Sequence, residues 1–185
     1  MSFSPVIPLS GYSGWIFLQR TLDSQKQTFV SSAQNQRDQE YFRQNIGKIE
    51  TAEQLVSDRR LFKVALGAFG LDDDINNRYF MQKVLADGTS EDTALANKLA
   101  DKSYARFSAA FGFGDGGTPA TQTEGFADTI LAAYNDRQFE IAVGEQDETM
   151  RLAMNAKREL VTLAAGTSSD DTNPHSPSKS LISLS

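Results

Sequence analysis

Apolar residues recur at helical spacing along most of the chain, and the longest nearly apolar run covers residues 61–71. In a helix, the side chains of this run form two adjacent apolar faces, with Phe62, Leu66 and Phe69 on one and Leu61, Ala65 and Ala68 on the other. A helix with such a wide apolar surface belongs in the middle of a fold. Gly70 comes at the end of the run and supplies a left-handed residue that can end the helix. The pattern therefore predicts a buried central helix.

The same period predicts two helices before the central one and three after it. Their apolar positions are Trp15, Leu18, Leu22 and Phe29 from Gly14 onwards; Tyr41, Phe42 and Ile46 up to Gly47; Ile75, Tyr79, Val84 and Leu85; Leu95 and Leu99; and Tyr104, Phe107 and Phe111. Polar residues mark the N-termini of several of these predicted helices. Thr51 and Gln54 fit a capping box, residues 72–74 place three aspartates at the start of the helix after the central one, and Thr89 or Ser90 is expected to cap the next.

After Pro119 the helical period resumes and continues almost to Gly166. The apolar positions are Phe126, Ile130 and Tyr134, and then Phe139, Val143, Met150, Met154, Val161 and Ala164. We therefore expect a long C-terminal helix that is bent at Gly144. No stretch of useful length alternates between apolar and polar residues, so the predicted fold class is all-α, in a single helical domain.

The ends of the chain differ in composition from the middle. Residues 1–12 carry prolines, serines and one glycine without a period, and residues 166–185 hold seven serines and two prolines. We therefore expect a flexible N-terminal arm at 1–12, the helical domain at 13–165 and a disordered, serine-rich tail at 166–185.

Composition narrows the classes of function. The formal net charge is −6 and the basic residues are scattered, which argues against a nucleic-acid-binding surface. No apolar run approaches the ~20 residues that a membrane-spanning helix requires. The chain has no cysteine, which excludes disulfides, thiolate metal sites and cysteine nucleophiles but leaves the compartment open. No basic residue precedes Arg20, so we expect no cleavable signal, and the protein is either cytoplasmic or exported without one.

Two segments of the sequence resemble each other. LVSDRRLFKVALGAFGLDD contains Phe69-Gly70, and LADKSYARFSAAFGFGD contains Phe111-Gly112. In each, an aspartate, Asp58 or Asp101, lies about three helical turns before the Phe-Gly pair. A helix closed by Phe-Gly and an apolar residue is a reusable packing unit. The sequence therefore predicts a degenerate internal repeat of two such units.

The same two segments, in particular FGLDDDI and LADKSY…FGFGD, resemble the bacterial family known as domain of unknown function 1217 over about residues 12–165. The resemblance implies a protein found mostly in alphaproteobacteria and commonly encoded among flagellar genes, with no established activity, cofactor or catalytic residue. It also implies a further Phe-Gly segment after the long helix. Here the chain continues as TSSDDTNPHSPSKSLISLS instead, which leaves open a truncated or altered C-terminus.

Two motifs suggest ligands, but each lacks a required part. Gly112, Gly114 and Gly117 have G-x-G-x-x-G spacing, yet a helix rather than a strand precedes them and Pro119 keeps a helix from opening directly after them, so we expect a turn. Residues 72–76 begin like a calcium loop, but its sixth position is Asn77 and its twelfth is Lys83 instead of glycine and glutamate. Helix capping explains the three aspartates better.

Few other residues suggest catalysis or ligand binding. His175, the only histidine, lies in the predicted tail, which removes histidine-based catalysis and zinc sites from consideration. Glu145 with Asp147 or Glu148 could form a carboxylate pair, although a solvated helix face is the simpler interpretation. Four aromatic residues could line a pocket but are more typical of a core: Phe62, Phe69, Phe107 and Phe111.

We therefore expect no catalytic, cofactor-binding or metal-binding residue, no cofactor and no enzymatic activity. The hypothesis is a non-enzymatic protein that binds other proteins, and the family resemblance suggests flagellar components as partners. The alternative is a helical domain that binds a small apolar ligand in its core, with one or two convergent polar groups. The sequence leaves open the identity of the partner and the oligomeric state.

Overall fold

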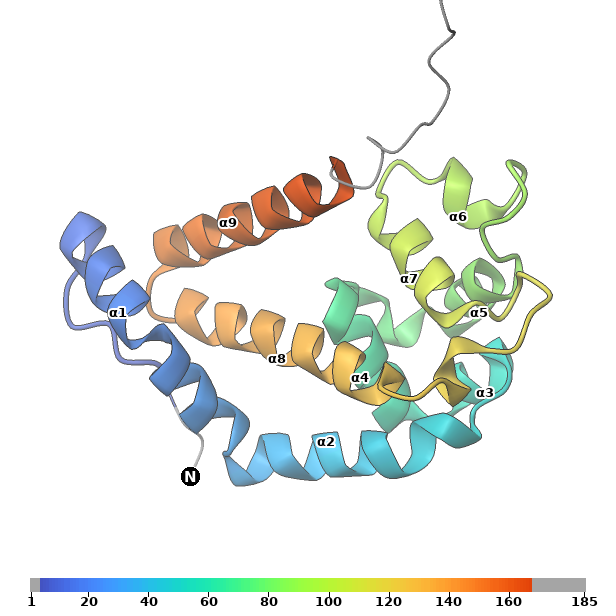
Figure 1. Cartoon of the computed structure of the whole chain (residues 1–185), viewed down its shortest axis with the longest axis horizontal. Coiled ribbons are helices and arrows are strands. Elements are labelled where there is room, and N and C mark those ends of the chain that lie inside the picture. The colour runs from blue at the N-terminus through green and yellow to red at the C-terminus, as the bar shows by residue number, and fades with distance from the viewer. Residues whose placement is uncertain (1–3, 168–185) are drawn as a thin grey trace, which may run out of the picture.

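Helix α4 (Arg59–Phe69) lies at the centre of the fold, as its wide apolar surface predicts (Figure 1). The structure is a computed structural model that describes residues 4–167, without the side chains of Gln34 and of residues 162–167. Within that range it contains helices and no strand, which confirms the all-α fold class. The other elements are α1 (Gly11–Val30), α2 (Ala33–Asn45), η1 (Ile46–Lys48), α3 (Ala52–Ser57), η2 (Asp72–Asn76), α5 (Arg78–Ala86), α6 (Leu95–Lys98), α7 (Ser103–Phe111), η3 (Ala120–Gln122), α8 (Phe126–Gly144) and α9 (Glu148–Thr167).

Both ends of α4 are fixed by the residues that flank it in sequence. At the start, Oδ1 of Asp58 accepts hydrogen bonds from the backbone amides of Arg60 and Leu61. At the end, Gly70 has a φ of 72°, and the amides of Gly70 and Leu71 both donate to the carbonyl of Leu66. Residues adjacent in sequence therefore fix both ends of α4, and the apolar side chains between them pack against neighbouring elements.

Helix α7 repeats this construction, which agrees with the predicted internal repeat. Oδ1 of Asp101 accepts a hydrogen bond from the amide of Ser103, and Gly112 ends the helix with a φ of 65°. The two units also pack on each other, because the rings of Phe69 and Phe107 meet edge to face with centroids 5.3 Å apart. The repeat is thus a structural pair around one shared aromatic cluster.

The apolar side chains form two separate clusters. The larger lies around α4 and draws on α2, α3, α5, α7 and α8. The smaller joins α1, α9 and the second half of α8; its buried members are Leu18, Phe29, Phe139, Val143, Met150 and Met154. Helix α8 takes part in both clusters, so it connects the terminal helices α1 and α9 to the rest of the domain (Figure 1).

The described part of the predicted N-terminal arm is extended and bonded to the domain. Gln25 of α1 is buried, and its side chain accepts from the amide of Val6 at 2.7 Å and donates to the carbonyl of Val6 at 3.1 Å. Gln146 donates to Ser4 and to the carbonyl of Pro5. Flexibility of residues 1–12 stays a prediction, and most of the predicted tail, from residue 168 on, lies outside the described residues.

The C-terminal pattern forms two helices where the sequence predicted one bent helix. Helix α8 ends at Gly144, and Asp147 then caps α9 by accepting from the amide of Met150 at 3.1 Å. Helix α9 folds back along α8 (Figure 1), so Met150 packs against Val143 in the same small cluster. The apolar residues keep helical spacing across the turn because both helices direct their apolar faces to one cluster. For this reason the sequence pattern indicated a bend where the chain reverses direction.

Two further details differ from the sequence prediction. Residues 89–94 are not helical, because the amides of Thr89 and Ser90 donate to Oδ1 of Asp115, a residue far along the chain, at 2.8 and 3.0 Å. Residues 72–86 form η2 and α5 rather than one helix, and Tyr79 is 82% exposed instead of facing the core. At residues 89–94 the local pattern was helical, but the contact with Asp115 from elsewhere in the chain replaces the expected helix start.

Candidate functional site

Two of the three aspartates of residues 72–74 bond to other helices, and none of them caps a helix through a side-chain hydrogen bond. They lie in the short helix η2, where Asp74 accepts a hydrogen bond from the hydroxyl of Tyr104 at 2.8 Å. Burial and this bond raise the pKa of Tyr104 to about 12. Asp72 accepts from Gln138 of α8 at 3.4 Å. Among the residues that the structure describes, no group of three or more histidine or acidic side chains could hold a metal ion.

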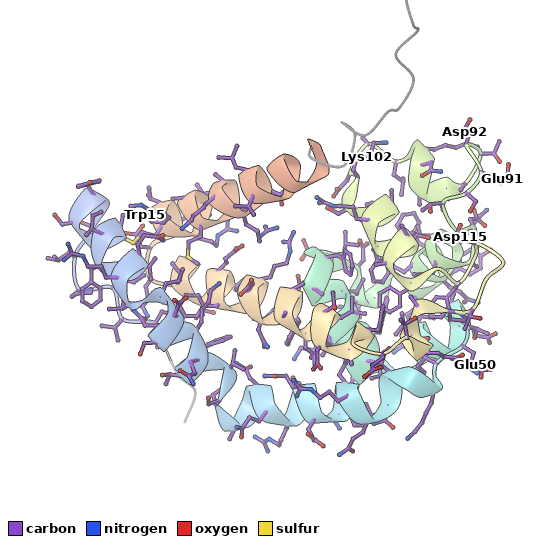
Figure 2. All side chains as sticks on the ribbon, in the orientation of Figure 1. Trp15, Glu50, Glu91, Asp92, Lys102 and Asp115 are labelled. Carbon is purple, nitrogen blue, oxygen red and sulfur yellow. The ribbon has the colours of Figure 1, made fainter. Side chains whose placement is uncertain are left out.

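The glycine-rich turn after α7 packs against another turn. A Cβ atom on Gly114 would lie 2.2 Å from the backbone nitrogen of Gly88 and 2.4 Å from the carbonyl of Ala86, so only glycine fits there. Asp115, exposed beside it (Figure 2), accepts hydrogen bonds from Thr89 and Ser90, and these bonds lower its pKa. The G-x-G-x-x-G spacing thus reflects the contact between two turns.

The candidate carboxylate pair is not assembled into a catalytic arrangement. Asp147 caps α9, and Glu148 bonds to Arg151 on the same helix. The bond from Arg151 lowers the pKa of Glu148. Glu145 is exposed at the end of α8. Asp147 and Glu148 therefore have structural partners, Glu145 lies on the exposed surface, and His175 lies outside the described residues.

The aromatic residues proposed as core fill the large cluster. Phe62, Phe107 and Phe111 are fully buried, whereas Phe69 is partly exposed. Phe111 contacts Phe107 at 5.1 Å and Phe126 at 5.2 Å between ring centroids. The rings pack on one another, so the interpretation as a core is confirmed.

The feature that stands out on the surface is a groove between α1 and α9, which we call the α1–α9 groove. Its first part is a pocket of about 340 Å³ with an almost entirely apolar surface. The pocket is lined by Gly11, Tyr12, Trp15, Asp147, Thr149, Met150 and Ala153. Figure 2 shows Trp15 at this end of the molecule, where α1 lies beside the start of α9. The small cluster therefore opens to solvent along one side.

The second part of the α1–α9 groove is a pocket of about 250 Å³ with an apolar floor and a charged rim. Leu22, Met154 and Val161 are among its lining residues. Two ion pairs border it, Lys26 with Asp136 at 2.8 Å and Arg158 with Glu140 at 3.0 Å. Within this second part, Lys157 of α9 donates to the side-chain oxygen of Gln19 of α1 at 2.6 Å. A hydrogen bond therefore links α1 to α9 at the second pocket.

Large apolar side chains remain exposed at both ends of this groove. Tyr12 is 79% exposed at the start of α1, and Leu160 and Val161 are 67% and 63% exposed on α9. Val161 lies eleven residues after the buried Met150, so it continues the inner face of α9. The face that is buried in the first half of α9 is therefore open in the second half.

A larger depression, of about 1030 Å³, runs along α2, and the side chains that line it are mostly polar. Arg60 stacks over the ring of Tyr41, with 3.8 Å from Cζ to the ring centroid, and Tyr41 donates to Asp58 at 2.7 Å. Arg43 pairs with Asp128 at 3.0 Å. These groups already bind one another, so this depression is a weaker candidate than the α1–α9 groove.

Sequence reasoning did not identify the α1–α9 groove. It placed Trp15, Met150 and Met154 on apolar helix faces, which is confirmed, but it gave no means to see that α1 and α9 would lie together. Exposed Leu160 beside Val161 was the available signal, because two adjacent apolar residues near the end of an amphipathic helix broaden its apolar face.

Two of three comparisons with known proteins found a match. A family model described as "Protein of unknown function (DUF1217)" matches residues 68–169, just over half of the chain and from the end of α4 through α9. No curated protein matches. The X-ray crystal structure of protein AGR_C_984 from Agrobacterium tumefaciens is similar, with 28% sequence identity and a TM-score of 0.74. The similarity covers 84% of this chain and 70% of that chain.

Proposed function

The chain belongs to the DUF1217 family of proteins of unknown function, and we propose that it is a non-enzymatic protein that works by binding another protein through the α1–α9 groove. The observation that carries the proposal is the open small cluster: an apolar pocket beside Trp15 and the exposed Leu160 and Val161 lie along one pair of helices. Contiguous exposed apolar surface marks interaction sites in soluble proteins.

An apolar helix is the kind of element that suits this surface. The groove is formed by two helices, and the exposed Val161 continues the inner face of α9 into its second part. A partner helix could place one apolar row against Trp15 and Val161, in the manner of helix-in-groove recognition. Lys26 and Asp136 at the rim supply charges of both signs that can fix its register.

The proposal extends to the bacterial flagellum, in its assembly, structure or regulation. This part is supported only by the family resemblance, whose members are commonly encoded among flagellar genes. No helix within the described range is long and apolar enough to cross a membrane.

Deletion of the gene tests the flagellar part. We expect loss of motility that the intact gene restores. A Val161→Glu gene should fail to restore it, because a charge in the groove opposes apolar docking. The matched control is Tyr79→Glu, which changes an exposed aromatic residue on α5, away from the groove. A fully motile deletion strain with normal filaments contradicts the flagellar role, and full rescue by Val161→Glu contradicts the role of the groove.

A second candidate function is binding of a small apolar ligand, and the pocket beside Trp15 is the observation that favours it. Its volume of about 340 Å³ lies within the usual range for ligand sites. Trp15 is the only tryptophan, so its fluorescence reports on this pocket alone. We expect a fatty acid to shift the emission saturably if this function holds. An emission spectrum that does not change on titration contradicts it.

A further inference from the structure

Arg137 of α8 is a half-buried cation whose guanidinium group has no hydrogen-bond acceptor among the residues that the structure describes. A guanidinium carries five N–H donors in a rigid, planar fork. Burial, followed by the like charge of Arg158, lowers the pKa of Arg137. The side chain therefore holds a charge that its protein surroundings compensate poorly.

The position of Arg137 is fixed by packing. Its guanidinium lies against Gly70 at the end of α4, so that a Cβ atom on Gly70 would lie 2.1 Å from Nη1 and 2.6 Å from Cζ. The carbonyl end of a helix carries partial negative charge, which favours a cation there. The contact with Gly70 holds the group in place without using its N–H donors in bonds to described residues.

Two other arginines lie near Arg137, and they do have partners. Arg158 of α9 bonds to Glu140 at 3.0 Å and to Glu159 at 2.9 Å, and Arg106 of α7 lies 3.6 Å from Glu159. These carboxylates are therefore engaged by other cations. Arg106, Arg137 and Arg158 belong to α7, α8 and α9, and the ion pair between Arg106 and Glu159 links α7 to α9 beside Arg137.

We propose that Arg137 is the centre of a binding site for a single carboxylate group, between α7, α8 and α9. A carboxylate matches the guanidinium fork with two parallel N–H···O bonds. Glu140, Glu159 and Asp101 lie near the site and would repel a doubly charged phosphate more strongly than a singly charged carboxylate. The source is either a free carboxylic acid or an acidic side chain of a polypeptide. Arg158 and Glu140 border both this site and the second part of the α1–α9 groove, but Arg137 itself does not line the groove. The proposed site does not depend on the function proposed above.

Nuclear magnetic resonance of the arginine Nε–H groups in the full isotope-labelled chain tests the site. We expect the Arg137 resonance to shift saturably with sodium acetate and not with sodium chloride at equal ionic strength. Arg137→Gln should weaken acetate binding by about tenfold or more, as loss of a charged hydrogen-bonding partner implies. Binding is followed in that variant through the backbone amides around Gly70.

Controls separate the site from general effects of salt and from misfolding. Arg43→Gln removes an arginine on α2 and should leave the acetate shift unchanged. Arg137→Lys keeps the charge but not the fork, so it should bind acetate more weakly than the native chain and retain the fold. An amidated peptide with one glutamate, compared with its glutamine counterpart, identifies polypeptide as the source if it binds more tightly than acetate. Equal shifts with acetate and chloride, or undiminished acetate binding in Arg137→Gln, overturn the proposal.

Discussion

Substitution of alanine for Gly70 and, separately, for Gly112 compares the two halves of the internal repeat. Both glycines end a helix in the left-handed region, with φ values of 72° and 65°. The space around them differs. A Cβ atom on Gly112 would meet nothing within 4 Å, whereas a Cβ atom on Gly70 would meet the guanidinium of Arg137 at 2.1 Å. Comparing Gly112→Ala with Gly70→Ala therefore separates the free-energy cost of a left-handed alanine from the cost of its contact with Arg137.

The expected magnitudes combine these two effects. An alanine in the left-handed conformation costs about 1–2 kcal/mol, and the lower entropy of the unfolded alanine chain offsets about half of that. Gly112→Ala should therefore lower the free energy of unfolding by about 1 kcal/mol. Gly70→Ala must also displace Arg137, and an off-rotamer side chain adds about 1 kcal/mol. We expect about 2 kcal/mol for Gly70→Ala.

Urea unfolding monitored by circular dichroism measures both variants, with the midpoint and slope compared with the native chain. The double variant Gly70→Ala/Arg137→Ala should be less destabilised than the sum of the single variants, because the clash is removed once. Equal costs at Gly70 and Gly112, or strict additivity in the double variant, would show that Arg137 does not pack on Gly70. The same result would remove the basis for a fixed carboxylate site.

Three further outcomes are expected. Phe107→Ala should lower the free energy of unfolding in urea by about 3–5 kcal/mol, and Phe69→Ala by roughly half as much, because Phe107 is fully buried and Phe69 is not. Equal losses for the two variants would contradict this description of the core. Asp58→Ala should cost about 1–2 kcal/mol, and Asp101→Ala less, since Asp58 accepts from two backbone amides and from Tyr41 whereas Asp101 accepts from Ser103. Burial raises the pKa of Tyr134 to about 12, above its unfolded value near 10, so its contribution to stability is complete below pH ~10 and is lost as the pH rises toward ~12. Tyr134→Phe should remove that part of the alkaline loss, and an unchanged pH profile would contradict the assignment.

Much of the fold could be predicted because its signals are local. Gly70 and Gly112 end their helices as their sequence positions indicate, and Asp58 and Thr51 cap theirs. The central helix could be identified because its apolar surface is too wide for any place but a core. In these cases the residues that determine the structure lie within one helical turn of the place that they affect.

The errors arose where distant residues determine the structure. Thr89 and Ser90 looked like helix caps, yet no helix begins there, and their own amides donate to Asp115 of another turn. The reversal after Gly144 was hidden because Val143 and Met150 keep helical spacing across it. The α1–α9 groove has the same origin, since it depends on two helices that lie at opposite ends of the sequence.

Affinity purification of the tagged protein from its own host, with mass spectrometry of the co-eluting proteins, tests the central claim most directly. The native chain, Val161→Glu and Tyr79→Glu would be purified in parallel. We predict enrichment of rod, hook, filament or export proteins of the flagellum with the native chain and with Tyr79→Glu, and loss of that enrichment with Val161→Glu. No flagellar protein with the native chain, or the same proteins with all three, would contradict binding through the α1–α9 groove.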